Sequence, residues 1–168
     1  VKDEKVGNPR NGTIAVIYAE GSIMYDPNGV TEGVITPDNI LEKVEKAMQT
    51  KNLRGIVLRV NSGGGSALAS EVIYQELTKL NIPIYVSMSD TTASGGYYIS
   101  MAGNKVFANN ATITGSIGVV SMLPKLYNAQ NKYGVHSNSV SKGKYSDIND
   151  SFAPLSEESR AKITQSME

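Results

Sequence analysis

The sequence predicts an α/β domain in which parallel strands alternate with helices. Apolar, β-branched runs recur at residues 13–19, 55–60 and 82–88, and runs of this length are typical of buried strands. Residues 36–50 and 67–80 lie between these runs and repeat apolar side chains at helical spacing. Because strands joined through helices pair in parallel with right-handed crossovers, the alternation indicates a parallel sheet.

The composition narrows the class of protein. A chain of 168 residues suits one domain with a sizeable core. It carries 16 Lys and Arg against 16 Asp and Glu, and this zero net charge argues against a nucleic-acid partner held by phosphate neutralisation. Cysteine is absent, which excludes disulfides and a thiol nucleophile. The sequence has no run of about 18 apolar residues, the length of a membrane span, and its charged start is unlike a signal peptide.

The N-terminal third is expected to form a linker, a strand and a helix. Residues 1–12 are polar and predict a linker, so the domain is expected to cover residues 13–168. The strand at 13–19 has apolar residues on both faces, which is typical of a sheet covered on both sides. Thr36 is the expected N-cap of the helix, with Pro37 in its first turn. Its apolar positions are Ile40, Leu41, Val44, Ala47 and Met48.

Two glycine-rich turns follow the next two strands. Residues 59–66 lead from the second strand into the helix at 67–80, and residues 91–98 lead from the third strand into a short buried helix at 97–102. Because the carboxyl ends of parallel strands meet at one edge of a sheet, we expect these turns to lie side by side, where ligand and catalytic sites form. The inward positions of the longer helix are expected to be Leu68, Val72, Ile73, Leu77 and Leu80.

Ser94 stands in the second turn and is directly followed by Gly95. The N-terminus of a helix offers unpaired N–H groups and a partial positive charge, and both stabilise a developing oxyanion. Ser94 is therefore a candidate nucleophile. On this segment alone, an equally good interpretation is that Ser94 caps the helix and that the glycines serve packing only.

The last third mixes strand, helix and loop signals. A strand is expected at 105–108 and an extended run at 111–120, where Gly115 and Gly118 indicate that another backbone comes close. That backbone is either a substrate added as a strand or part of an internal bulge. A helix at 124–133, a strand at 135–140 and a helix capped by Ser156 are expected to follow. The only histidine, His136, lies in the strand, and we favour a structural role for it over a general base.

Four motifs, in order, resemble the signal peptide peptidase A (protease IV) family. They are residues 57–66 (VLRVNSGGGS), 69–73 (ASEVI), 93–100 (ASGGYYIS) and 114–119 (TGSIGV). The resemblance covers residues 13–168 and implies a serine protease with a Ser/Lys dyad on a Clp-protease/crotonase-like spiral of parallel strands and helices. Gly63 departs from the family, which commonly has a proline at that position.

The resemblance also implies roles for single residues. Ser94 becomes the nucleophile, and the N–H groups of Gly65 and Gly95 form the oxyanion hole. Ser116 matches a family serine that hydrogen-bonds near the lysine amine, although a turn cap explains its position equally well. No metal or cofactor is implied, because no carboxylate and histidine cluster has ligand spacing. The first glycine turn also lacks the Gly-Lys-Ser/Thr ending of a phosphate loop.

The general base is missing from its expected place. The family has a lysine directly after the tyrosine in the loop at 141–148, and Ser146 stands there. Three explanations are possible. The chain is the C-terminal half of a two-half protease whose N-terminal half supplies the lysine, or the lysine has been replaced by engineering or by loss of activity. In the third explanation, Lys144 or Lys142 serves as the base instead. A two-residue slip moves a side chain by about 7 Å, which disfavours the last alternative. We favour the first, and the start at Val1 without Met agrees with it.

The resemblance therefore predicts a serine endopeptidase domain that degrades signal peptides or other membrane-derived peptides. Its expected partners are peptide substrates, the N-terminal half of the same protein and further copies of itself. It is expected at a bacterial cell membrane, on the extracytoplasmic side, anchored through parts of the protein outside this sequence. The alternatives are a crotonase-type acyl-CoA enzyme, which uses the same oxyanion geometry without a serine nucleophile, and a non-catalytic assembly domain.

Overall fold

The computed structural model describes residues 12–26, 32–146 and 148–167. The chain divides into two compact units, residues 1–117 and residues 118–168, and each unit is described by itself. The predicted linker lies outside the described residues except for Gly12.

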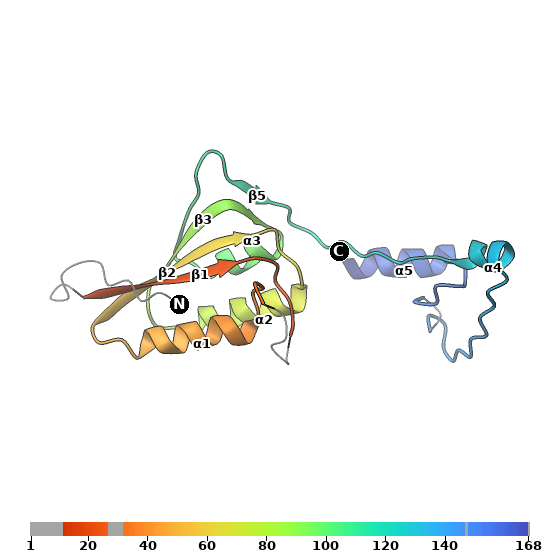
Figure 1. The fold of residues 1–168 in the computed structure, drawn as a ribbon, viewed down its shortest axis with the longest axis horizontal. Helices are drawn as coiled ribbons and strands as arrows, with labels where there is room; N and C mark the ends of the chain where they lie inside the picture. Colours follow the sequence, from red (N-terminus) through yellow and green to blue (C-terminus); the bar gives the residue numbers. More distant parts are fainter. Residues whose placement is uncertain (1–11, 27–31, 147, 168) are drawn as a thin grey trace. The chain divides into compact units, whose positions relative to one another are not determined.

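The first unit is built on a five-stranded parallel sheet (Figure 1). Its strands are β1 (Thr13–Glu20), β2 (Leu53–Ser62), β3 (Ile84–Ala93), β4 (Lys105–Phe107) and β5 (Ile113–Gly115). The first four lie side by side in chain order, and β5 pairs with the C-terminal end of β3. The predicted parallel sheet is therefore confirmed. β3 runs further than predicted, so Ser94 directly follows the strand.

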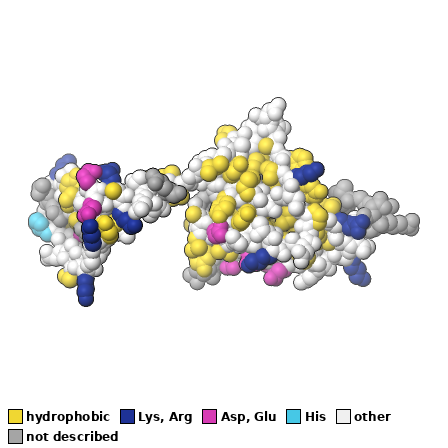
Figure 2. Space-filling model, turned by 180° about the vertical axis from the view of Figure 1, so that it is seen from behind, with side chains coloured by type: hydrophobic (Ala, Val, Ile, Leu, Met, Phe, Trp, Pro, Cys, Tyr) yellow, Lys and Arg dark blue, Asp and Glu magenta, His cyan; other side chains and the backbone are white. Residues whose placement is uncertain are grey.

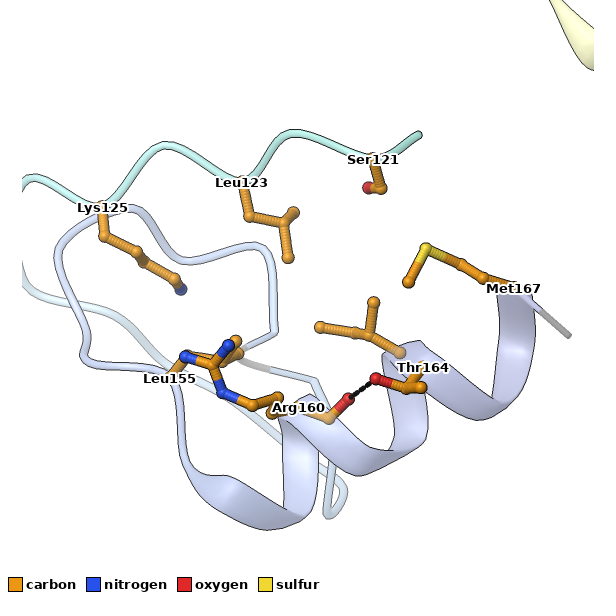
Figure 3. Close-up of a pocket in the computed structure, with 8 residues that line it drawn as sticks. Ser121, Leu123, Lys125, Leu155, Arg160, Thr164 and Met167 are labelled. Atoms are coloured by element: carbon orange, nitrogen blue, oxygen red, sulfur yellow. Dashed lines mark hydrogen bonds between the residues drawn. The ribbon is translucent and has the colours of Figure 1, made fainter. Parts of the chain in front are cut away.

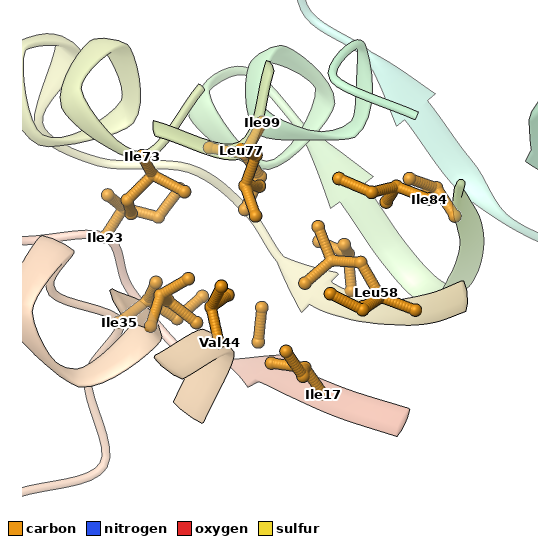
Figure 4. Close-up of a cluster of buried hydrophobic side chains, with 14 of the residues drawn as sticks. Ile17, Ile23, Ile35, Val44, Leu58, Ile73, Leu77, Ile84 and Ile99 are labelled. Atoms are coloured by element: carbon orange, nitrogen blue, oxygen red, sulfur yellow. The ribbon is translucent and has the colours of Figure 1, made fainter. Parts of the chain in front are cut away.

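The helices α1 (Pro37–Met48), α2 (Ala67–Thr78) and α3 (Gly95–Ser100) enclose the core with the sheet. Figure 4 shows Ile17 and Leu58 of the strands facing side chains of α1 and α2. The inward residues of α2 are Ala69, Ser70, Ile73 and Leu77. Because neighbouring helix positions are rotated by about 100°, Leu68 lies off this face, and its predicted burial is wrong, since it is 60% exposed.

The predicted start of α1 is confirmed. The Thr36 hydroxyl accepts a hydrogen bond from the Asn39 backbone N–H, and the Asn39 side chain accepts one from the Thr36 N–H, both at 3.1 Å. These two bonds form a capping box, which satisfies N–H groups that have no acceptor inside the helix.

The prediction that β1 is covered on both faces is wrong for this unit. Ile17 and Ala19 are buried against the helices, whereas Ile14, Val16 and Tyr18 are 53%, 52% and 55% exposed. Phe107 of β4 is also exposed. Hydrophobic side chains gather over the larger unit in Figure 2. Parallel sheets are usually buried on both faces, so the outer face of this sheet lacks the cover that the sequence pattern led us to expect.

The second unit contains α4 (Tyr127–Tyr133) and α5 (Glu157–Met167). Gly134 ends α4 with φ 65°, and the Ser156 hydroxyl caps α5 by accepting the Ser159 N–H at 3.1 Å. Both helices were predicted. The strand predicted at 135–140 is wrong, because those residues form neither helix nor strand; a strand needs a neighbour to pair with. Every helix in the described parts of the chain falls short of the length and apolarity of a membrane span.

Candidate active site

The ends of β2 and β3 bring the two glycine turns into contact. Ser62 and Thr92 pair across the two strands. A Cβ atom added to Gly64 would lie 2.6 Å from the Gly95 nitrogen and 2.7 Å from the Ser94 Cβ. Only the absence of a side chain lets the Gly64 backbone come this close. The two turns therefore lie side by side, as the sequence predicts.

Ser94 has an unusual backbone. Its φ of 50° and ψ of −120° lie outside the left-handed helical region that residues other than glycine visit most easily. Holding such a conformation costs about 1–3 kcal/mol and is typical of active sites. Two backbone hydrogen bonds fix it: the Ser94 N–H donates to the Gly115 carbonyl and its carbonyl accepts the Tyr98 N–H, both at 2.9 Å. The chain turns sharply here from β3 into α3.

The Ser94 hydroxyl makes no capping hydrogen bond. Among the described residues it has no other partner, and the residue is half-buried. Ser66, at the start of α2, differs because its hydroxyl accepts the Ala69 N–H at 3.2 Å. The interpretation of Ser94 as a side-chain cap is therefore wrong. Its hydroxyl is free to react.

Gly95 and Gly65 each carry an available backbone N–H. Gly95 is the first residue of α3, so its N–H has no acceptor within the helix. Gly65 forms a parallel bridge with Ile23, in which the Ile23 N–H donates to the Gly64 carbonyl at 2.9 Å and the Ser66 N–H to the Ile23 carbonyl at 2.8 Å. This bridge does not use the Gly65 N–H. Neither N–H donates a hydrogen bond within the described residues.

Ser116 lies one residue beyond Gly115, the acceptor of the Ser94 N–H. Its φ is 52° and its side chain is exposed. Strand β5 is held against β3 by backbone pairing and by the Thr114 hydroxyl, which donates to the Thr92 carbonyl at 2.8 Å. The fold therefore places Ser116 beside the elbow at Ser94, and its catalytic role remains a prediction.

The backbone of β3 pairs with Gly115, but the space on the Cβ side of Gly115 and Gly118 is open. A Cβ atom added to either would meet nothing within 4 Å. Their φ values of 91° and 157° instead explain the glycines, because other residues rarely adopt them. Gly115 pairs with Ala93 without a shift of register, so no bulge occurs at that glycine, and a substrate strand stays a prediction.

The sequence patterns do not single out Ser62 and Gly64 as site residues. Gly64 is the residue that touches Ser94, and the Ser62 hydroxyl accepts the Gly64 N–H at 3.1 Å. The available signal was the run of three glycines at 63–65, because a glycine run predicts close approach of another backbone. In the structure, Gly64, the middle glycine, makes this contact with the second turn.

The surroundings of Lys144, in the 141–148 loop, oppose a role as the general base. Lys144 forms an ion pair of 2.5 Å with Glu158, and this hydrogen bond and the opposite charge raise the pKa of Lys144 above its usual value. A general base must be neutral, so this environment opposes the role. The Ser146 hydroxyl donates to the Gly143 carbonyl at 2.8 Å. His136 is exposed in the second unit.

Within the described residues, the pocket of the second unit does not make a better site. The second unit has a pocket of about 300 Å³, shown in Figure 3. Its one lysine, Lys125, donates to the carbonyls of Ile148 and Asp150 at 3.2 and 2.7 Å, and the rest of its lining holds no nucleophile with a base. In the described ranges, no group of three or more His, Cys, Asp or Glu residues is placed to hold a metal ion.

Comparison with known proteins gives a family match. A family model described as Peptidase family S49 matches residues 76–168, more than half of the chain. Protease 4 of Salmonella typhi is 42% identical over 140 residues, which are 82% of this chain and 22% of that protein. The chloroplastic serine protease SPPA of Arabidopsis thaliana is 38% identical over 139 residues, 80% of this chain and 20% of that protein.

The chain thus spans about a fifth of the length of these two relatives. Among solved structures, the 1510-N membrane-bound stomatin-specific protease matches with a TM-score of 0.56 and 20% identity, over 68% of this chain and 52% of that one. At this identity the likeness concerns the fold alone. It confirms the predicted α/β class with a Clp-protease/crotonase-like arrangement.

Proposed function

The chain belongs to peptidase family S49, and we propose that it is the serine-bearing domain of a Ser/Lys endopeptidase. Ser94 is the nucleophile in this proposal. The observation that carries it is the strained backbone of Ser94, which holds a free hydroxyl beside the first N–H of α3. Strained backbone conformations of this kind cluster at functional sites, where the surrounding structure holds them in place.

The proposed reaction begins when the Ser94 oxygen attacks the carbonyl carbon of the peptide bond. The hydroxyl proton passes to a neutral lysine amine, and the carbonyl oxygen becomes an oxyanion that accepts N–H bonds from Gly65 and Gly95. The tetrahedral intermediate then breaks its carbon–nitrogen bond, and the leaving amine takes the proton from the lysine. Water hydrolyses the resulting ester on Ser94 by the same route. Ser116 helps to orient the lysine amine.

We assign the base to a part of the protein outside this sequence, the N-terminal half. The supporting observations are Ser146 at the expected lysine position, the ion pair that keeps Lys144 charged, and the small share of the relatives that the chain covers. In the same proposal residues 13–168 form the serine-bearing domain, and residues 1–12 link it to the preceding half.

The proposed substrates are signal peptides or other membrane-derived peptides. The proposed place of action is the extracytoplasmic side of a bacterial membrane, with anchoring by other parts of the protein. A relative named as a putative signal peptide peptidase SppA, from Enterococcus faecium, supports the substrate class. The similarity to bacterial relatives such as Protease 4 of Salmonella typhi supports the bacterial setting.

A fluorophosphonate probe tests the proposed function. We expect the full-length protein to become labelled at Ser94, because only an activated serine attacks the phosphorus, and mass spectrometry of the labelled peptide identifies the residue. Ser94→Ala provides the control. Peptide hydrolysis without labelling of Ser94 would argue for a different nucleophile. Absence of both would favour the crotonase-type or assembly alternatives.

We also propose that the full-length protein is a homo-oligomer. The outer face of the sheet exposes the apolar residues Ile14, Val16 and Tyr18, and parallel sheets usually have both faces buried against other protein segments. We expect the Val16→Asp/Tyr18→Asp double variant to lower the sedimenting mass, since a buried unpaired charge opposes association. Thr50→Asp, which adds one charge after α1, is the control and should leave the mass unchanged. A wild-type protein that sediments as a monomer while active would rule out the oligomer.

A further inference from the structure

Buried hydroxyls surround the elbow at Ser94. Those of Ser62, Ser70, Thr92 and Ser100 are all less than 4% exposed. Three of them donate to carbonyl oxygens: Ser70 to Ser66, Thr92 to Val60 and Ser100 to Gly96. Ser62 differs, because its hydroxyl accepts a hydrogen bond from the Gly64 N–H at 3.1 Å. In the described chain this is the one side-chain hydrogen bond to residues 63–65.

Gly64 is held from two sides. Its N–H is bound by Ser62, and its carbonyl accepts the Ile23 N–H at 2.9 Å. The Gly64 carbonyl and the Gly65 N–H belong to one planar peptide group and point in opposite directions. The bond from Ile23 therefore turns the Gly65 N–H away from Ile23. The bond to Ser62 fixes the Gly64 N–H, at the start of the residue whose carbonyl belongs to this peptide group.

The hydrogen bond from Gly64 to Ser62 can orient one N–H group of the oxyanion hole. We propose that Ser62 is a positioning residue, whose hydroxyl holds Gly64 against Ser94 and so places the Gly65 N–H for the oxyanion. This inference rests on the proposed function of Ser94. Without the hydroxyl, three consecutive glycines lose their only side-chain restraint in the described chain, and glycine has more backbone freedom than any other residue.

Loss of the Ser62 hydroxyl should destabilise the transition state more than the bound substrate. An oxyanion donor must lie within hydrogen-bond distance of the oxygen as its charge develops, and small misplacements lower the rate strongly. Substrate binding depends on the rest of the peptide. Loss of Ser62 should therefore lower kcat and leave KM nearly unchanged, whereas a merely structural role would change only the stability.

The test compares Ser62→Ala with Ser62→Thr in the full-length protein. We expect Ser62→Ala to lower kcat by about 10- to 100-fold with KM within about twofold. Binding of a peptide aldehyde should weaken by a similar factor, because its hemiacetal oxygen occupies the oxyanion hole. Ser62→Thr keeps the hydroxyl and should restore both. Ser62→Cys preserves the volume but offers a weak acceptor, so it should resemble alanine if Ser62→Ala fails to fold.

Thr36→Ala is the matched control. Like Ser62, Thr36 is largely buried and accepts a backbone N–H at 3.1 Å, but it caps α1. This variant should lose stability and keep its kcat. A Ser62→Ala enzyme with normal kcat and aldehyde binding would overturn the inference, as would an equal loss of kcat in Thr36→Ala. Ser94→Ala measured in parallel separates the two proposals, because retained hydrolysis in that variant defeats the proposed function itself.

Discussion

Replacement of Ser94 by alanine in the full-length protein should abolish peptide hydrolysis, with a loss in kcat of about 10⁴-fold or more. The expected loss is this large because the missing oxygen forms the covalent bond to the substrate. The fold should remain, since the Ser94 hydroxyl has no hydrogen-bond partner among the described residues. Turnover of a peptide substrate and the circular dichroism of the purified variant measure the two effects.

Ser94→Gly separates chemistry from backbone strain. Glycine adopts positive φ without the steric cost that a Cβ atom brings, so this variant should be inactive yet more stable than Ser94→Ala by about 1 kcal/mol. Chemical denaturation gives the free energies of unfolding. If Ser94→Gly were the less stable of the two, the backbone at φ 50° would not be strained. The strained backbone of Ser94 would then no longer support the proposed function.

The sequence was sufficient for the parts of the site that depend on local chemistry. Glycine runs after two apolar strands predicted turns at one sheet edge, and the contact of Gly64 with Ser94 confirms that they meet. Thr36 and Pro37 predicted the start of α1, which is also as expected. In both cases the signal lies within a few residues, because turn and cap geometry is set by nearby backbone and side-chain groups.

Features that depend on contacts between distant segments were not predictable in this way. Apolar residues on both faces of β1 indicated burial, yet Val16 and Tyr18 are exposed in this unit. The polarity of a strand does not reveal whether another segment packs on each of its faces. The role of Ser62 depends on the packing of Gly64 against a turn some 30 residues further along the sequence. Residues 135–140 have strand-like side chains, but the described residues of the second unit hold no strand beside them, and pairing decides strand formation.

The 168-residue chain alone should be inactive toward peptides. Serine attacks slowly unless a base removes its proton, and Ser146 stands at the position where the resemblance implies a lysine. Lys144 is a poor substitute, because Glu158 raises its pKa and keeps the amine protonated at neutral pH. Lys144→Met should therefore leave the activity of the full-length protein nearly unchanged, whereas loss of the proposed N-terminal lysine should abolish it.

Restoring a base gives the decisive test of that expectation. The isolated chain should neither hydrolyse a peptide ester nor take up a fluorophosphonate at an appreciable rate, since oxyanion donors alone leave only weak residual catalysis. Addition of the N-terminal half should restore both, and should fail to do so with Ser94→Ala. Ser146→Lys should help only if the surroundings lower the pKa of the new amine, because a charged lysine accepts no proton. Full activity of the isolated chain would place the base within these 168 residues, and loss of that activity in Lys144→Met would then identify it.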